Sequence, residues 1–482
     1  MTTATNCASV GGRVRQAGVA LLTAAALATG WGCSNQIESN IDKLAAGGAE
    51  AESAKMALSM ARGEAVEPLM AAFADRQYPA TSRAAMADAL FSLYLREKDE
   101  RILELLRSAL SDEAAPVRRV AVRALGDLKT TDAAGAILGQ LADESDNGVR
   151  QEILVTLSMM GRQDRPIMSP TLDFRSRVDM LSEEEQAQFI AILQGMRREG
   201  MPDALMHKTM DWLESIAEGY IVEAQRLLVE ADLAGAEAML LQARDLVPDS
   251  KNANQRLGKF HYQNGDARKG LEIMREIGAA IDVPRLTRAP AIDGKLDDEP
   301  WQGVQPITDF YQNVAQMRAF TIEGESRAYV GHRDGILYIG IRGYEPSTHD
   351  LTAAAQDRDD LAYQDDCVEV FFDANLDGRT YHQFVINNIG TIMDQYNDGE
   401  SRGGDLGWNG ELESAQHLGD DFWSIELAIP LNQFGIPAPG AGDVWGANIA
   451  RIRITHASEY GQWVPTYGSA LRPDRFGYLV FQ

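Results

Sequence analysis

The spacing of hydrophobic residues changes once along the chain. Up to about residue 282, apolar positions recur three and four residues apart, which is the period of amphipathic helices. Beyond that point they alternate in twos: in WSIELAI, Ile425 and Leu427 share one face while Ser424 and Glu426 take the other. Many such short runs, separated by Gly, Asp, Asn and Pro, are typical of an antiparallel sandwich. The sequence therefore predicts a multidomain protein, with an N-terminal all-α solenoid and a C-terminal all-β antiparallel sandwich.

Three helical segments share one spacing, in which an arginine precedes a leucine by seven residues. The pairs are Arg83 with Leu90, Arg118 with Leu125, and Arg150 with Leu157. A helix pair of this size cannot bury its apolar stripe alone, so neighbouring pairs must stack. With their acidic turns followed by Val-Arg, residues 55–165 resemble HEAT repeats.

The boundary between the first helical region and a second one, residues 166–282, falls within the proline-containing linker RQDRPIMSPTLDF. The segment SEEEQAQFIAILQGM predicts a helix capped by Ser182, with acidic residues in its first turn. The stretches ADLAGAEAMLLQARDLVPDS and GKFHYQNGDARKGLEIM resemble tetratricopeptide repeats. Such a solenoid either binds a protein along a concave face, here an envelope protein, or serves as a rigid spacer. The sequence leaves both roles open.

The N-terminus predicts export. Arg13 and Arg15 precede the short apolar run GVALLTAAALATGWG, which ends in small residues and is too short to span a membrane. Cys33 follows at once, and the pattern resembles a bacterial lipoprotein signal. Residues 1–32 are then a signal peptide and 33–54 an anchor and linker, with a lipid on Cys33 holding an extracytoplasmic protein to the membrane of the envelope or cell surface. Cleavage after Ala28 is the alternative, and it would give a periplasmic or secreted protein.

Composition and charge exclude one class of partner. The chain has 71 Asp and Glu against 45 Lys and Arg, a formal charge of −26, and no basic run to contact phosphates. Nucleic acid is therefore not an expected partner. Of the three cysteines, Cys7 leaves with the signal peptide and Cys367 lies in an apolar strand, so no disulfide framework is predicted.

Catalytic motifs were sought and not found. The sequence has no G-x-S-x-G, no H-E-x-x-H and no glycine-rich phosphate loop, and its seven histidines have no metal-binding spacing. Paired carboxylates are frequent, but an acidic surface produces such pairs by chance. The sequence therefore favours a binding protein over an enzyme.

The β half carries three motifs that belong together. AIDGKLDDEPW opens it, DDCVEVFFDANLDGRTYHQF lies in its middle, and RPDRFGYLVF closes it. With this strand order, residues 283–482 resemble a family 9 carbohydrate-binding module, a β-sandwich of the broader DOMON-like group. The resemblance implies a non-catalytic domain that binds a glycan or polysaccharide.

The resemblance also implies a site. In the family an aromatic residue shortly before the VEVF-type strand stacks on the sugar, and that position matches Tyr363. The strand's glutamate accepts sugar hydroxyls and matches Glu369, and the amide of the QF strand matches Gln383. An exposed loop aromatic and an ordinary strand acid would leave the same pattern at Tyr363 and Glu369.

Two positions depart from the family pattern. Val385 stands where the family has an arginine, and Ala470-Leu471 stand where it has a second stacking tryptophan. One side of the aromatic clamp is then missing. Trp463 and Tyr467 are the candidates to replace that ring.

The turn DANLDGRTYHQF predicts a structural calcium ion. Asp373, Asn375 and Asp377 stand at positions one, three and five, followed by Gly378, as in the first half of a calcium loop. Phe384 occupies the twelfth position, so the bidentate glutamate of an EF-hand is absent. A plain β-turn selects the same residue types and remains the alternative.

Two further hypotheses stay open for the sandwich. DOMON-like domains include haem binders with Met, His or Lys ligands, for which Met317, Met393, His382 and His417 are available. No spacing singles out a pair among them. The other hypothesis is an envelope scaffold in which the sandwich is purely structural.

Overall fold

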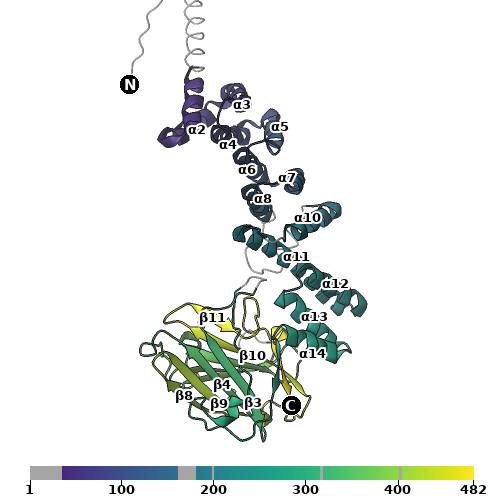
Figure 1. Cartoon of the computed structure of the whole chain (residues 1–482), viewed down its shortest axis with the longest axis vertical. Helices are drawn as coiled ribbons and strands as arrows, with labels where there is room; N and C mark the ends of the chain where they lie inside the picture. The colour runs from purple at the N-terminus through teal and green to yellow at the C-terminus, as the bar shows by residue number, and fades with distance from the viewer. Residues whose placement is uncertain (1–34, 161–180, 198–199, 315–318, 401–403) are drawn as a thin grey trace, which may run out of the picture. The chain divides into compact units, whose positions relative to one another are not determined.

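The computed structural model describes residues 35–160, 181–197, 200–314, 319–400 and 404–482. The chain divides into two compact units, the first ending at Thr209 and the second beginning at Met210. Helical repeats come first and an antiparallel sandwich comes last, which confirms the predicted fold class (Figure 1). Within the described residues, no helix is both long enough and apolar enough to cross a membrane.

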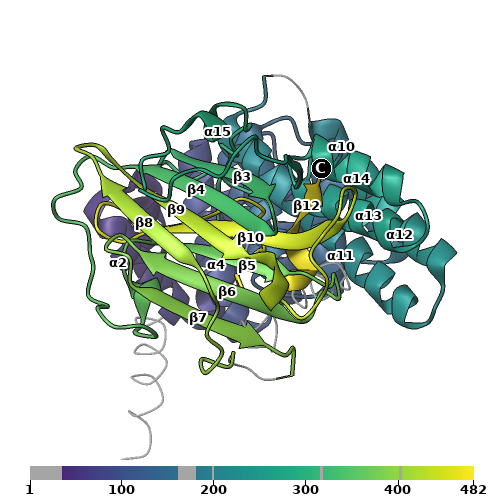
Figure 2. The same cartoon turned by 90° about the horizontal axis from the view of Figure 1, so that it is seen from below.

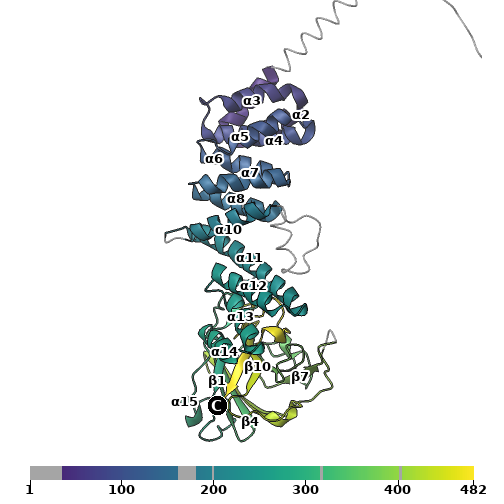
Figure 3. The same ribbon diagram turned by 90° about the vertical axis from the view of Figure 1, so that its right-hand side faces the viewer.

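The first unit is built from short helices that stack in succession (Figure 3). They are α2 (Ala51–Met60), α3 (Val66–Ala74), α4 (Ala80–Glu97), α5 (Glu100–Ala109), α6 (Ala115–Gly126), α7 (Thr131–Asp143), α8 (Asn147–Met160) and α10 (Glu183–Met196). The predicted cap of α10 is confirmed, because the Ser182 side chain accepts from the Glu185 N–H while the Glu185 side chain accepts from the Ser182 N–H.

The repeated arginines join one helical repeat to the next. Arg83 on α4 donates to Asp112 ahead of α6, with Nη1 2.7 Å from Oδ2. Arg118 on α6 donates in the same way to Glu144 ahead of α8, at 2.7 Å. Burial by itself would raise the pKa of Asp112. Hydrogen bonds from Arg83, the Ala114 N–H and Arg76 outweigh it and lower that pKa to about 2. Two of the three repeated arginines therefore form inter-repeat ion pairs, whereas Arg150 donates to Asn147 of its own helix at 3.3 Å.

The described part of the segment predicted as anchor and linker is folded. Residues 35–46 are helical and bury Ile37, Ile41 and Leu44, whose spacing places them on one helix face. The Ser82 hydroxyl on α4 donates to the Ala45 carbonyl at 2.6 Å, which ties this helix to the repeats. The sequence analysis did not predict this helix, because only three apolar residues mark its buried face. Residues 1–34, which include the signal peptide and Cys33, lie outside the described residues.

The second unit begins with helices that belong to the predicted tetratricopeptide-like region. They are α11 (Asp203–Val229), whose first turns belong to the first unit, then α12 (Leu233–Leu246), α13 (Lys251–Gln263) and α14 (Ala267–Glu276). Side chains of Asp232, Ser250 and Asp266 accept from backbone N–H groups and so begin the last three helices. A Cβ on Gly270 would lie 2.6 Å from the Gly258 carbonyl oxygen, so α13 and α14 cross closely because both positions are glycine.

Two sheets form the sandwich (Figure 2). The larger sheet has eight strands, with the order β1-β12-β10-β5-β6-β7 and with β11 and β2 continuing from β10. These strands are β1 (Ala280–Val283), β2 (Tyr311–Gln312), β5 (Cys367–Asp373), β6 (Tyr381–Asn387), β7 (Ile392–Asn397), β10 (Val444–Arg453), β11 (Glu459–Gln462) and β12 (Gly477–Phe481). The smaller sheet, in the order β3-β4-β9-β8, comprises β3 (Ser326–Arg333), β4 (Ile336–Tyr344), β8 (Glu413–Leu418) and β9 (Phe422–Pro430).

The core of the sandwich lies between the two sheets. Val370 and Phe372 of β5 meet Ile425 and Leu427 of β9 there, as the alternation in the sequence predicts. Between the described strands, all pairings are antiparallel except that of β1 with β12, which is parallel, and an isolated bridge of Arg285 with His332 is parallel as well. The sandwich thus starts at β1, slightly before the predicted boundary at residue 283.

The motif that opens the β half covers the outer face of the smaller sheet. Glu426 accepts from the backbone N–H groups of Asp293 (2.9 Å) and Gly294 (2.7 Å) and from the Trp301 indole N–H (2.7 Å). Ser424 donates to the Gly294 carbonyl at 2.6 Å. The alternation predicted that Ser424 and Glu426 face away from the core, and they do, but both are buried under this second layer.

Candidate functional site

The outer face of the larger sheet carries the two residues predicted to bind sugar hydroxyls. Along β5, Cys367, Glu369 and Phe371 point to this face, because alternate residues share one side of a strand. Gln383 of β6 pairs with Phe371, and Val385 pairs with Glu369. Glu369 and Gln383 are therefore diagonal neighbours on one face.

Two apolar clusters cover this face on either side of Glu369. The first consists of Ala355, Ala362, Cys367, Val385 and Met393, and the second of Phe371, Tyr381, Ala450, Ala470 and Phe476. Cys367 and Phe371 flank Glu369 along β5, so the glutamate lies between the clusters.

Each cluster leads directly to an exposed apolar side chain. Tyr363 follows Ala362 in the 3-10 helix η3 (Ala362–Gln364) and is 40% exposed. Leu471 follows Ala470 and is 42% exposed. The helix η3, on which Tyr363 is exposed, therefore covers the face that carries Glu369 and Gln383, and Leu471 lies beside the second cluster.

Glu369 is only 3% exposed and accepts a hydrogen bond from the Tyr460 hydroxyl. Burial raises the pKa of Glu369 to about 7, and the bond from Tyr460 opposes that rise. Among the described residues, the buried Tyr381 hydroxyl has no hydrogen-bond partner, and burial together with the charge of Glu369 raises its pKa to about 12. Sequence reasoning missed both tyrosines, because only strand pairing brings them to Glu369.

Gln383 is held within the sheet. Its side-chain carbonyl accepts from the amide of Gln395 on β7, and both side chains are buried. The pair presents one further row of polar groups beside Glu369 on the same face.

Trp463 and Tyr467 are not available as replacement rings. Trp463 is buried in the core between the sheets, and its indole N–H donates to the Gly278 carbonyl at 2.8 Å. Tyr467 is buried with its ring centre 5.1 Å from the guanidinium carbon of Arg475. Neither ring has a free face on which a sugar could stack, so the suggestion that one of them completes the clamp is not supported.

The helices of the second unit hold the segment that contains Tyr467. Arg475 Nη1 donates to the Asn252 side chain of α13 at 2.8 Å, and Nη2 lies 3.4 Å from the Glu218 carboxylate of α11. Gln255 donates to the Arg475 carbonyl at 2.6 Å. The side chains of Arg475, Asn252, Glu218 and Gln255 are all buried. These contacts hold the segment after Tyr467 against the helices.

The predicted calcium residues form a hydrogen-bonded turn between β5 and β6. Asp373 accepts from the N–H groups of Asp377 (3.2 Å) and Gly378 (2.9 Å), and the Asn375 side-chain oxygen accepts from Asp377 at 3.2 Å. Asp377 in turn accepts from Arg379 and Thr380. In the part of the chain that the structure describes, no group of three or more His, Cys, Asp and Glu is arranged to hold a metal. These bonds are those of a self-contained turn, and the calcium ion stays a prediction.

The described haem candidates do not face one another. Met393 points to the outer face of the larger sheet, opposite Val385. His382 packs against Trp408 and Phe434, and burial lowers its pKa to about 4. His417 belongs to β8 of the other sheet, and Met317 lies outside the described residues. No two of the three described side chains are placed as a pair of axial ligands.

Comparison with known proteins identifies two parts of the chain. Residues 66–158 match the sequence profile of HEAT repeats, and residues 292–479 match that of the "carbohydrate family 9 binding domain-like" family. Both matches confirm the resemblances found in the sequence. The C-terminal domain is thus a family 9-like carbohydrate-binding domain.

One curated relative is the endo-1,4-beta-xylanase A of Thermoanaerobacterium saccharolyticum, 29% identical over 178 residues. The match covers 36% of this chain but only 13% of that enzyme's length. Among solved structures, a family 9 module of Caldicellulosiruptor kristjanssonii in complex with glucose is 20% identical, with a TM-score of 0.33, covering 42% of this chain and 95% of the module. The same kind of module in complex with cellotriose gives the same identity, TM-score and share of this chain, with 93% of the module covered.

Proposed function

We propose that the family 9-like domain binds a glycan or polysaccharide on the outer face of its larger sheet. The observation that supports this most directly is the placement of the exposed Tyr363 ring on the face that carries Glu369. A flat aromatic face suits the C–H groups of a pyranose, and a carboxylate beside it accepts sugar hydroxyls. The buried Tyr381 hydroxyl, which has no partner among the described residues, lies in the apolar cluster beside Glu369.

Binding is expected to be weak. Leu471 replaces an aromatic ring and Val385 replaces an arginine, so one stacking contact and one charged donor are missing. Glu369 is almost covered, so the sugar meets Tyr363 first. We expect a Kd of roughly millimolar to tens of micromolar.

A glycan array with the whole chain, followed by titration of the best glycan, tests the proposal. Tyr363→Ala should cost about 1–3 kcal/mol of binding free energy without lowering the melting temperature, because the ring is exposed. Leu418→Ala, which removes an exposed apolar side chain from β8 of the other sheet, is the matched control. Equal affinity in wild type and Tyr363→Ala would remove Tyr363 from the site, and a blank array would favour a structural sandwich.

We infer that the protein binds carbohydrate without turning it over. The sequence holds none of the catalytic motifs sought, and the relative that is an enzyme shares only a small part of its length with this chain. Prolonged incubation with the glycan found on the array should release no new reducing ends. Release of reducing ends in proportion to protein concentration would show instead that the chain is an enzyme.

The proposed context is extracytoplasmic. Cys33 and the apolar run before it support a lipid anchor, from which the helical repeats present the sugar-binding domain as a spacer or bind an envelope protein as a scaffold. Cys33→Ser should move the protein from the detergent phase to the soluble fraction, since a lipid contributes about 0.8 kcal/mol per buried CH₂. Unchanged partitioning would contradict the anchor. Pull-down from envelope extracts separates scaffold from spacer.

A further inference from the structure

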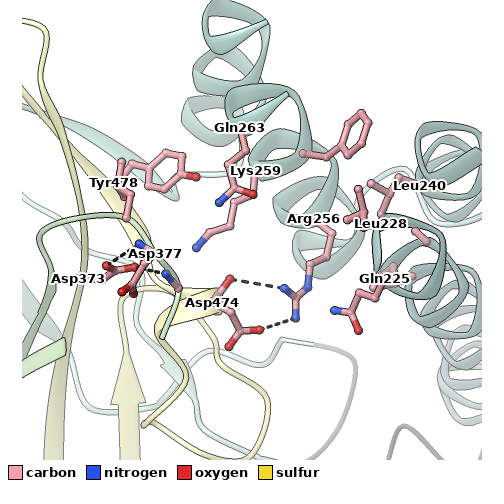
Figure 4. Close-up of a pocket in the computed structure, with 15 residues that line it drawn as sticks. Gln225, Leu228, Leu240, Arg256, Lys259, Gln263, Asp373, Asp377, Asp474 and Tyr478 are labelled. Atoms are coloured by element: carbon pink, nitrogen blue, oxygen red, sulfur yellow. Dashed lines mark hydrogen bonds and ion pairs between the residues drawn. The ribbon is translucent and has the colours of Figure 1, made fainter. Parts of the chain in front are cut away.

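A pocket of about 230 Å³ lies within the second unit, beside the end of β5, and none of Tyr363, Glu369 and Gln383 lines it. Three helices, α11, α12 and α13, form one side, and the β5–β6 turn with Asp474 and Tyr478 forms the other (Figure 4). The helical side carries the apolar residues Ile221, Ala224, Leu228, Leu240 and Phe260, and also Gln225, Arg256, Lys259 and Gln263. The opposite side carries three aspartates, so apolar groups and charges of both signs line the pocket.

Lys259 is the unusual member of this pocket. It is 9% exposed, and it makes no hydrogen bond or ion pair with any residue that the structure describes. Its ammonium lies 5.2 Å from the centre of the Tyr478 ring, and Figure 4 shows it pointing toward the side of Asp373, Asp377 and Asp474. Burial lowers its pKa to about 7. Its ammonium reaches the pocket without an acceptor among the described residues, and a ligand oxygen would supply that bond.

The three aspartates of the pocket differ in how many hydrogen bonds and ion pairs they already make. Asp474 is paired with Arg256 at 3.1 Å and with Arg472 at 2.9 Å. Asp377 accepts several bonds within its own turn. Asp373 accepts only two backbone N–H groups and, because a carboxylate has about four acceptor positions, retains capacity for a ligand donor. Lys259 and Asp373 therefore both have hydrogen-bonding capacity to spare, and Arg256 Nε is a further donor without a partner among the described residues.

This pattern selects among ligand classes. A simple anion would bond to Lys259 but would also face three aspartates, and a simple cation would face Lys259 and Arg256. A sugar carries no charge to match Lys259 and Asp373. A zwitterion with an apolar group matches every wall: carboxylate to Lys259, ammonium to Asp373, and apolar side chain against Leu228, Leu240 and Phe260.

We propose that this pocket binds a free α-amino acid with an apolar side chain, such as leucine or methionine. The proposal is independent of sugar binding, since the two sites share no residue. It places a small-molecule site where the repeat helices meet the sandwich within one unit.

Calorimetric titration of the whole chain in EGTA tests it, with leucine, methionine, leucinamide, N-acetylleucine, glycine and glucose as probes. Leucine or methionine should bind, while leucinamide and N-acetylleucine, which each lack one charge, should bind at least about tenfold more weakly. Glycine lacks the side chain and should also be weaker. EGTA keeps any calcium at Asp373 out of the comparison.

Variants locate the site. Lys259→Met keeps the volume but removes the ammonium and should abolish binding, while Lys269→Met on the exposed surface of α14 should leave it unchanged. Leu228→Asp tests the apolar wall at a partly exposed position and should also weaken binding. No heat with any amino acid at millimolar concentration, or binding that survives both Lys259→Met and Leu228→Asp, would overturn the proposal. Lys259-dependent binding of glucose in place of leucine would overturn it as well.

Discussion

Each sheet of the sandwich buries one glutamate on its outer face, and the two glutamates differ in the hydrogen-bond donors around them. Glu426 on the smaller sheet accepts from two backbone N–H groups and an indole N–H, all supplied by the segment that opens the domain. Glu369 on the larger sheet accepts from a single tyrosine hydroxyl, beside another hydroxyl that has no partner in the described structure. Burial raises the pKa of both carboxyls.

The difference separates a structural acid from a candidate binding acid. A buried carboxylate surrounded by fixed donors has nothing left to offer a ligand, because its acceptor positions are filled by the fold itself. A buried carboxylate with one side-chain donor keeps acceptor capacity for a ligand. Local sequence does not distinguish the two, since both glutamates stand in alternating strands.

The largest effect is expected from Glu426→Ala. The change leaves two backbone N–H groups and the Trp301 indole buried without an acceptor, and each orphaned donor is costly. We expect about 3–5 kcal/mol of lost unfolding free energy, measured by urea denaturation. Glu413→Ala on the neighbouring strand β8 is the control, because Glu413 is exposed. Equal loss in the two variants would mean that Glu426 is not the special group described here.

Glu369→Gln should have the opposite effect, in that it weakens sugar binding and leaves the stability nearly unchanged. Glutamine keeps the shape and the bond to Tyr460 but is a weaker acceptor for sugar hydroxyls, so we expect about 2–3 kcal/mol of lost binding free energy with little loss of stability at pH 7. The measurement is titration of the array-selected glycan, with Glu411→Gln on the exposed surface as control. A variant that binds as wild type does, yet unfolds more readily, would reassign Glu369 to the structural class.

The pH dependence of stability sharpens the same contrast. The folded-state pKa of Glu369, about 7, lies above its ordinary value of 4.5, so the folded protein holds this proton more tightly than the unfolded chain does. The stabilisation is present below about pH 4.5 and is lost as pH rises through 7. Relative to Glu369→Gln, wild type should therefore lose about 1–3 kcal/mol of unfolding free energy between pH 5 and pH 8. A constant difference across that range would contradict the raised pKa.

The smallest effect concerns the β5–β6 turn. If calcium binds at Asp373, Asn375 and Asp377, the ion adds to a turn that already satisfies its own backbone, and the gain should be about 1 kcal/mol or less at moderate calcium concentration. The melting temperature of the whole chain should be higher in calcium than in EGTA, and Asp373→Ala should erase the shift. Identical melting curves in calcium and EGTA favour the plain turn.

Features that depend on local spacing were predicted well from the sequence. The arginine–leucine repeats, the capped helix after Ser182 and the core-facing side of β9 follow from periods of 3.6 and 2. The order of motifs identified both the HEAT repeats and the carbohydrate-binding domain. Strand alternation places Glu369 and Gln383 on one sheet face, and sugar binding by Tyr363, Glu369 and Gln383 stays a prediction.

The misses share a physical cause, which is that contact partners lie far apart in the sequence. Whether Glu426 is solvated depends on a segment 133 residues away. Trp463 and Tyr467 were suggested as sugar-binding rings, but the helices before the sandwich bury Tyr467 and the core takes Trp463. The role of Tyr460 follows from pairing of β11 with β10. The spacing of hydrophobic residues does not predict which outer face of a sheet a distant segment will cover.

The parallel pairing of β1 with β12 affects how the domain can be transplanted. The match to the carbohydrate-binding family begins at residue 292, yet the sheet begins at Ala280, shortly after α14 ends. A fusion protein that started at residue 292 would strip β12 of its neighbour and turn it into an open edge, which invites pairing between molecules. It would also deprive the Trp463 indole of the Gly278 carbonyl and Arg475 of Glu218 and Asn252. The portable module therefore includes α11 to α14, and is larger than the segment that sequence similarity outlines.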